Sequence, residues 1–303
     1  MSIFVGSAVA MVTPFNEEGV NIKKAKELID FLIEGKSDAI VLAGTTGESP
    51  ALEGNEFYEL FKNGIEHINK RVPVICGVGT NMTNEVIRRA TLAYECGADG
   101  LLIVNPYYNK SSDDGLVAHY KAISDAVPLP IIVYNVPGRT GRNISVGLMD
   151  RLADIEHVRG VKEASGDISQ ICDVIDVCGD RLDVYSGNDD QILAITALGG
   201  KGVISTSGNM QPQLNHDIVM ECLAGNLKKA QELQFKLNRL HHPLFAEVNP
   251  IPLKTAMNMV GFDVGHLRLP LVELEGAKRA QLRQALVDFG YEIVAEEGQA
   301  SVS

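Results

Sequence analysis

Lys162 is the residue whose type and setting most directly suggest covalent chemistry in this 303-residue chain. Within the stretch 158–165, period-two alternation places Lys162 on the same face as Val158 and Gly160, with Glu163 on the other face. Burial disfavours the charged ammonium and can lower a lysine pKa by about 3 to 5. A neutral amine attacks carbonyl carbon and forms a Schiff base. The pattern leaves a second interpretation open, in which Lys162 reaches solvent or pairs with a carboxylate.

A pair of hydroxyl residues follows the apolar run at 39–43. Thr45 and Thr46 stand between Gly44 and Gly47. Glycines on both sides permit a turn whose backbone N–H groups and hydroxyls converge on a small anion such as a carboxylate. An ordinary strand-to-helix loop has the same composition, so this pattern alone does not decide between the two.

Tyrosine and arginine side chains follow two further apolar runs. Tyr108 and Tyr134 carry hydroxyls that can move protons during the formation and hydrolysis of a Schiff base, with Thr45 as a further member of the relay. Arg139 offers a planar fork suited to a carboxylate. Loop aromatics and a surface ion pair are the alternative interpretation of these residues.

Eight short apolar runs, rich in β-branched residues, would position these side chains. Helical patterns separate them, which favours parallel strands covered by helices. We predict a (β/α)8 TIM barrel. An open doubly wound sheet is the alternative, but the sequence lacks the glycine fingerprint that such a sheet needs after its first strand. Barrel enzymes carry reactive residues at the carboxyl ends of strands, where Gly187 and Ile204 can wall a small pocket. The expected strands are 8–12, 39–43, 72–78, 100–104, 130–134, 158–162, 182–185 and 202–205.

The strand pattern ends near residue 224. Three helices are expected after it, at 227–240, 252–260 and 277–289, with Pro243, Pro250 and Gly261 at the breaks. We therefore predict a catalytic barrel domain at 1–224, a C-terminal helical domain at 225–294 and a flexible tail at 295–303.

Composition limits the partners. A net charge of -12 disfavours nucleic acid and anionic membranes, because both require a cationic surface. No run of 18 apolar residues occurs, and no leader pattern is present. Five scattered cysteines without CxxC spacing favour buried free thiols in a cytoplasmic protein. No HxH or HxxxH spacing suggests a metal site.

Taken together, these residues resemble the dihydrodipicolinate synthase family, within the pyruvate-dependent class I aldolases that include N-acetylneuraminate lyase. The resemblance extends from about residue 5 to residue 291. It is carried by the segments 44–49 (GTTGES), 106–109 (PYYN), 134–141 (YNVPGRTG), 161–164 (VKEA) and 267–270 (LRLP).

The resemblance implies a lyase that condenses pyruvate with L-aspartate 4-semialdehyde to 4-hydroxy-tetrahydrodipicolinate, on the route to diaminopimelate and lysine. It assigns the imine to Lys162, the pyruvate carboxylate to Thr45 and Thr46, and the proton relay to Thr45, Tyr134 and Tyr108. In this family the tyrosine at the position of Tyr108 reaches across from a neighbouring subunit. The resemblance therefore implies a dimer, and commonly a homotetramer built as a dimer of dimers. Neither cofactor nor metal is implied, because the imine is itself the electron sink.

Two other functions compete with this one. A related aldolase would cleave a sugar acid, such as N-acetylneuraminate or 2-keto-3-deoxygluconate, but Arg139 suits the carboxylate of a short amino-acid substrate better than a polyol. A non-catalytic barrel that senses a carboxylate would use Lys162 only as a charge partner. A pyridoxal-phosphate barrel also uses an imine lysine, yet no phosphate-cradling glycine loop is evident.

One departure concerns regulation. Family members inhibited by lysine often carry histidine or other polar side chains in the segment that follows the first motif. Asn81 and Glu85 are present here, but Gly54 and Phe57 supply no imidazole. We therefore predict weak or absent feedback by lysine.

Overall fold

The computed structural model describes residues 2–294, in which eight parallel strands close into a barrel. In chain order these are β1 (Gly6–Ala10), β4 (Ala39–Leu42), β5 (Val74–Gly77), β6 (Gly100–Val104), β7 (Ile131–Asn135), β8 (Val158–Glu163), β9 (Asp183–Ser186) and β10 (Gly202–Ser205). β1 pairs with both β10 and β4, and this closes the sheet. The predicted (β/α)8 barrel is confirmed, and each expected strand lies within two residues of its observed bounds.

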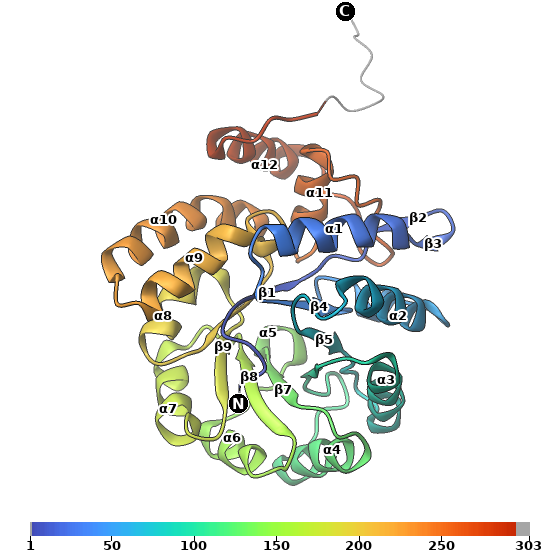
Figure 1. The fold of residues 1–303 in the computed structure, drawn as a ribbon, viewed down its shortest axis with the longest axis vertical. Helices are drawn as coiled ribbons and strands as arrows, with labels where there is room; N and C mark the ends of the chain where they lie inside the picture. Colours follow the sequence, from blue (N-terminus) through green and yellow to red (C-terminus); the bar gives the residue numbers. More distant parts are fainter. Residues whose placement is uncertain (1, 295–303) are drawn as a thin grey trace, which may run out of the picture.

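Helices surround the barrel, and the last of them form a separate layer beside it (Figure 1). An unpredicted hairpin of β2 (Phe15–Asn16) and β3 (Gly19–Val20) precedes the first helix. Three 3-10 turns, η1 (Ser49–Ala51), η2 (Asp189–Gln191) and η3 (Ser207–Asn209), follow strand ends. The helices are α1 (Ile22–Glu34), α2 (Glu56–Ile68), α3 (Thr83–Cys96), α4 (Asp113–Ala126), α5 (Pro137–Thr140), α6 (Val146–Ala153), α7 (Ile168–Cys178), α8 (Ile192–Ala197), α9 (Pro212–Leu223), α10 (Leu227–Leu244), α11 (Ile251–Met259) and α12 (Gly276–Phe289).

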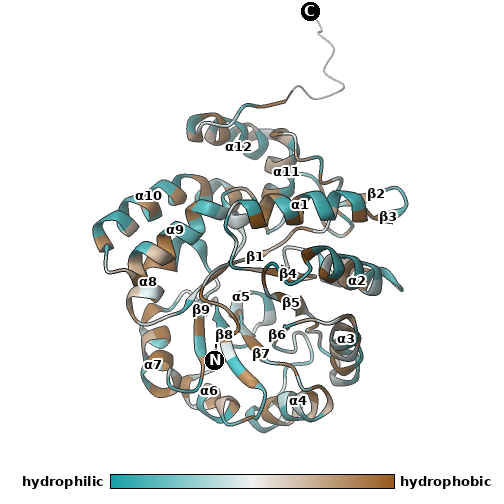
Figure 2. Ribbon diagram, in the orientation of Figure 1, coloured by the Kyte–Doolittle hydropathy of each residue, from teal (hydrophilic) through white to brown (hydrophobic). Residues whose placement is uncertain are grey.

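The hydrophobic core has two layers because alternate strand residues face opposite ways. Inside the barrel lie small and large residues such as Ala8, Ala10 and Ile132. Phe4 closes the end of the barrel nearest the N-terminus: its ring stacks on Tyr185 at 4.3 Å, and its carbonyl accepts the Tyr185 hydroxyl at 2.8 Å. The outer layer packs strands against helices, and each of these helices carries both hydrophobic and hydrophilic residues (Figure 2).

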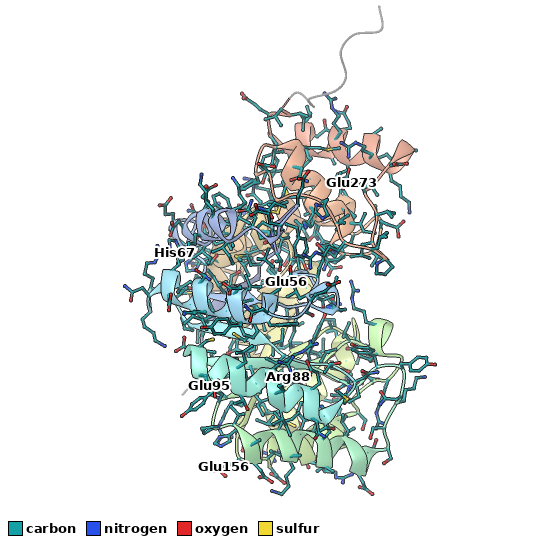
Figure 3. The ribbon with its side chains drawn as sticks, turned by 90° about the vertical axis from the view of Figure 1, so that its right-hand side faces the viewer. Glu56, His67, Arg88, Glu95, Glu156 and Glu273 are labelled. Carbon is teal, nitrogen blue, oxygen red and sulfur yellow. The ribbon has the colours of Figure 1, made fainter. Side chains whose placement is uncertain are left out.

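The C-terminal segment is tied to the barrel by charge. Arg268 donates to both carboxylate oxygens of Glu56 on α2, each at 2.6 Å. Figure 3 shows Glu56 on the side of the barrel, below the C-terminal helices that surround Glu273. This bidentate pair fixes the segment after α11 against the loop side of the barrel.

Several expectations need correction. Pro243 lies inside α10 rather than at a break, since its missing N–H costs only one hydrogen bond near the helix end. All five cysteines are free thiols, as expected, but Cys172 is exposed rather than buried. Val158 does not share the face of Lys162, because an irregularity at Arg159 shifts the register between β7 and β8.

The expected domain division at residue 224 falls in the turn between α9 and α10 and stays a prediction. The tail expected at 295–303 lies outside the described residues. Within residues 2–294, no helix is long and apolar enough to span a membrane.

Candidate active site

A small pocket of about 90 Å³ opens at the carboxyl ends of the barrel strands. It brings together most of the residues singled out from the sequence. Its lining is Ala10, Gly44, Thr45, Thr46, Leu102, Tyr134, Val136, Arg139, Lys162, Ala164, Gly187, Asn188, Thr206, Phe245 and Asn249.

Lys162 points into the barrel, which settles the orientation that the sequence left open. Its side chain is 5% exposed, and its Nζ lies 4.6 Å from the centre of the Tyr134 ring. Burial lowers the pKa of Lys162 from 10.5 to about 8. At pH 7 roughly one amine in ten is then neutral and able to attack a carbonyl carbon.

Asp189 explains why the pKa of Lys162 falls no further. This carboxylate is 1% exposed, and its charge raises the pKa of Lys162 in opposition to burial. Its Oδ2 accepts the backbone N–H groups of Thr206 and Ser207 at 3.2 and 2.6 Å, which holds the carboxylate in place. No sequence pattern indicates this role, because Asp189 follows β9 in a run of polar residues.

Lys162 has a buried tyrosine as register partner on each neighbouring strand, Tyr134 on β7 and Tyr185 on β9, and of the two Tyr134 lines the pocket. Burial raises the pKa of the Tyr134 hydroxyl, against smaller opposite effects of Arg139 and of a hydrogen bond with Thr45. The phenol is therefore protonated at neutral pH. It is placed to give a proton and to receive one back through Thr45.

The turn after β4 presents Thr45 and Thr46 to the pocket. Thr46 is 2% exposed, and its Oγ1 accepts a hydrogen bond of 2.9 Å from the Asn249 amide and lies 3.4 Å from the Thr206 hydroxyl. Glycine suits position 47, because a Cβ there would lie 3.0 Å from the Met11 carbonyl oxygen and from Thr13 Oγ1, tighter than an ordinary van der Waals contact. The turn is thus held from two sides, with its hydroxyls at the pocket.

Arg139 lies at the pocket mouth on α5. One guanidinium nitrogen donates to the Asn249 carbonyl at 2.9 Å. A second cavity of about 180 Å³ shares Thr45, Arg139 and Asn249 with the first and extends toward Pro270. Arg139 therefore stands where a second carboxylate can approach the reacting centre.

Two predicted site residues lie elsewhere. Ile204 is fully buried in the barrel interior and does not line the pocket. Tyr108 is 91% exposed, with a φ of 69°, and does not line the pocket of its own chain. Gly187 lines the pocket wall, as predicted.

Nine of the fifteen lining residues were not among the predicted site residues. Four of these nine have polar or aromatic side chains: Asn188, Thr206, Phe245 and Asn249. Asn249 matters most, because it contacts both Thr46 and Arg139. In the sequence, the segment around Asn249 indicates only a helix break. Within residues 2–294, no group of three His, Cys, Asp or Glu side chains is arranged to hold a metal ion.

The family assignment follows from comparison with known proteins. The model of the dihydrodipicolinate synthetase family matches residues 3–288. The chain belongs to this family. A protein of Caldicellulosiruptor bescii named 4-hydroxy-tetrahydrodipicolinate synthase is 49% identical over 294 residues, which cover 97% of this chain and 99% of that protein.

Solved structures agree with the family assignment. The chloride-inhibited dihydrodipicolinate synthase of Acinetobacter baumannii, solved in complex with pyruvate, is 41% identical, with a TM-score of 0.92 over 95% of this chain and 99% of that chain. A structure described as the first monomeric dihydrodipicolinate synthase variant is 39% identical, with a TM-score of 0.93 over 96% and 98% of the two chains.

The family membership makes this chain an enzyme of the lyase class. It confirms the resemblance drawn from the five sequence segments. It also favours the synthase reaction over the sugar-acid aldolase and over the non-catalytic carboxylate sensor.

Proposed function

We propose that this enzyme condenses pyruvate with L-aspartate 4-semialdehyde to 4-hydroxy-tetrahydrodipicolinate, through an imine between pyruvate and Lys162. One observation carries the proposal: a buried lysine with a pKa of about 8 faces a pocket walled by Thr45, Tyr134 and Arg139. The family relationship supports the same reaction.

Pyruvate binds first, with its carboxylate on the Thr45–Thr46 turn. The hydroxyl of Thr45 and the backbone N–H groups of this turn are donors suited to a carboxylate. The ketone carbon then lies toward Lys162, because the turn and the lysine line the same small pocket. The pocket of about 90 Å³ suits a three-carbon acid.

Neutral Lys162 attacks the ketone carbon, and the oxygen takes a proton to give a carbinolamine. Tyr134 donates the proton with which the hydroxyl leaves as water, and the nitrogen lone pair forms the protonated imine. The proton relay then takes a methyl proton, which gives an enamine. The enamine carbon adds to the aldehyde carbon of the semialdehyde while the aldehyde oxygen takes a proton from the relay, and this restores the protonated imine. The amine of the semialdehyde displaces Lys162 from the imine carbon, closing the ring and regenerating the free lysine.

Arg139 binds the carboxylate of the semialdehyde at the pocket mouth. The Asn249 carbonyl takes one of its N–H groups and orients the guanidinium. The remaining N–H groups can pair with a carboxylate. Arg139 and Lys162 line the same small pocket, so a substrate that bridges them has to be short. This favours a four-carbon aldehyde over a sugar acid.

Tyr108 completes the proton relay from a second copy of the chain. Tyr108 is exposed and does not line the pocket of its own chain. A residue that reaches into the pocket of a neighbouring subunit would have both properties. The functional unit is accordingly a homodimer, and the full assembly a homotetramer made of two such dimers. A monomeric relative makes the oligomeric state a property to be measured for each chain.

The reaction uses no metal and no cofactor, since the protonated imine accepts the electrons of the departing methyl proton. Activity that survives dialysis against EDTA is the expected result. The enzyme works in the cytoplasm, where its five free thiols stay reduced.

The deciding experiment is reduction with borohydride in the presence of pyruvate, followed by peptide mass mapping. We expect an adduct on the peptide that contains Lys162. Lys254 is an internal control, because it is equally buried but its amine pairs with Glu48. Absence of an adduct on Lys162 would leave only the sensor function. Repeating the reaction with the semialdehyde, in place of borohydride, tests formation of the cyclic product.

A further inference from the structure

Lys254 is a buried lysine that no step of the proposed chemistry uses. It lies on α11, 1% exposed. Its ammonium donates to the Thr13 carbonyl at 3.1 Å, to Glu48 Oε1 at 2.9 Å and to the His266 carbonyl at 2.6 Å. Because a lysine ammonium has three N–H groups, every one of them is used. Lys254 is therefore a structural residue, held by three hydrogen bonds, rather than a group available for chemistry.

Glu48 is the partner of Lys254 and stands at the end of the Thr45–Thr46 turn. Its carboxylate is also buried, with Oε2 accepting the backbone N–H of Arg268 at 2.9 Å. Its backbone has a φ of 54°, in the left-handed region that a residue other than glycine rarely adopts. Such a conformation persists where the surroundings hold it. The contacts of the Glu48 carboxylate provide that hold.

Thr13 connects the same lysine to the turn by a second route. Its carbonyl accepts from Lys254, and its hydroxyl donates to the Gly47 carbonyl at 2.6 Å. Lys254 thus acts on the residues at 47 and 48 together, immediately after the two threonines. Loss of the ammonium would remove the hydrogen bonds to Glu48 and to the Thr13 carbonyl together.

The C-terminal segment holds the other end of the turn as well. Asn249, in the loop before α11, donates to the Thr46 hydroxyl. Residues from 249 to 268 therefore touch the turn at Thr46 and at Glu48, and Lys254 joins α11 to it. The threonines are positioned by a part of the chain that follows the barrel.

We propose that Glu48 and Lys254 are a positioning pair for the pyruvate carboxylate, which set the affinity for pyruvate without touching it. The proposal rests on the proposed function of Thr45 and Thr46 as the carboxylate site. Its geometric basis is the buried chain of contacts from α11 through Lys254 and Glu48 to the turn.

The charges dictate how the pair is tested. Removing one partner leaves the other charge buried and unpaired, which destabilises a protein strongly. The double variant Glu48→Gln/Lys254→Met leaves neither charge and keeps the side-chain volumes similar. It is therefore the variant to compare with the wild type, after circular dichroism has shown that it is folded.

Steady-state kinetics should separate the two substrates. We expect the KM for pyruvate to rise about tenfold in the double variant, the factor that corresponds to the loss of one hydrogen bond to a charged group. The KM for the semialdehyde and the kcat at saturating pyruvate should stay within about twofold. A purely structural role would move all three quantities together.

A matched control lies at the opposite end of the barrel. His216 pairs with Asp38 at 2.8 Å, near the amino ends of the strands. The variant His216→Gln breaks this ion pair and should lower the melting temperature while leaving the KM for pyruvate unchanged. If it raises that KM as much as the double variant does, the proposal is wrong.

A smaller change covers the case in which the double variant does not fold. Thr13→Val removes only the hydroxyl that donates to the Gly47 carbonyl, and we expect a rise of several-fold in the KM for pyruvate. A pyruvate KM within twofold of wild type in whichever of these variants folds would overturn the positioning pair. Failure of the wild-type enzyme to form any borohydride-trapped imine would instead overturn the proposed function.

Discussion

Lys162 and Tyr134 are register partners on β8 and β7, and both side chains face the barrel interior with the lysine Nζ 4.6 Å from the ring centre. In the proposed reaction, this pairing places an amine that must lose a proton beside a phenol that must give one. Asp189 and burial act on the amine in opposite directions, and their balance gives a pKa of about 8. Near neutral pH the phenol is therefore protonated, and roughly one amine in ten is neutral, as imine formation needs.

The first prediction concerns pH. Because only the neutral amine attacks pyruvate, kcat/KM for pyruvate should rise with pH and level off above about pH 8. The variant Asp189→Asn removes the charge that raises the pKa of Lys162, so the rise should shift to lower pH. Asp190→Asn, a change at the adjacent and partly exposed residue, is the control. A shift to higher pH in Asp189→Asn would contradict this electrostatic account.

Tyr134 yields the second prediction. Tyr134→Phe removes the proton donor but keeps the ring against Lys162, so kcat should fall by about 10² to 10³ while pyruvate still binds. Stopped-flow measurement of imine formation locates the slow step. Tyr120→Phe is the matched control, because the Tyr120 hydroxyl is equally buried but donates to the Ile103 carbonyl. That control should lose stability and keep its kcat.

The third prediction concerns Arg139, which in the proposed reaction binds the semialdehyde and not pyruvate. We expect Arg139→Ala to lower kcat/KM for the semialdehyde by about a hundredfold, as loss of charge-assisted hydrogen bonds to a carboxylate implies, without loss of the pyruvate imine. Arg142→Ala is a nearby control, since Arg142 pairs with Asp113 instead. Unchanged semialdehyde kinetics in Arg139→Ala would favour a different second substrate.

The barrel was predictable because each strand is a short apolar run, rich in β-branched residues and flanked by Gly, Pro, Asn or Ser. The direction of Lys162 was not, since period two says which residues share a face but not which face points inward. The predicted shared face of Val158 and Lys162 was also wrong, because Arg159 is an extra residue in β8 that shifts the alternation. Asn249 escaped prediction for another reason: it contacts Thr46 across 203 residues of sequence, through a loop that folds back over the barrel mouth.

Feedback by lysine is expected to be weak or absent. Gly54 and Phe57 offer no imidazole, and Phe57 is buried beneath the Arg89 guanidinium at 4.2 Å. Glu85 is held by Arg88 and Arg89, and these contacts, the Arg88 hydrogen bond foremost, lower its pKa to about 2. Its charge is thus already paired within α3. A coupled assay with added lysine measures the effect, and inhibition at sub-millimolar lysine would refute the prediction.

Subunit complementation tests the role of Tyr108 in a neighbouring site. Tyr108→Phe and Lys162→Ala should each be nearly inactive alone. If Tyr108 acts across the contact, a mixed dimer contains one complete site, which combines Lys162 of one subunit with Tyr108 of the other, and activity returns on mixing. If Tyr108 acts within its own chain, no mixed dimer holds a complete site and activity stays low.

The control for complementation is a mixture of Tyr134→Phe with Lys162→Ala. Tyr134 and Lys162 line the same pocket of one chain, so no exchange of subunits can reunite them. Mass spectrometry confirms that subunits have exchanged in both mixtures. Recovery with Tyr108→Phe but not with Tyr134→Phe requires a shared site, because the two mixtures differ only in which tyrosine is lost. Recovery in neither, with exchange complete, would place Tyr108 outside the catalytic relay between subunits.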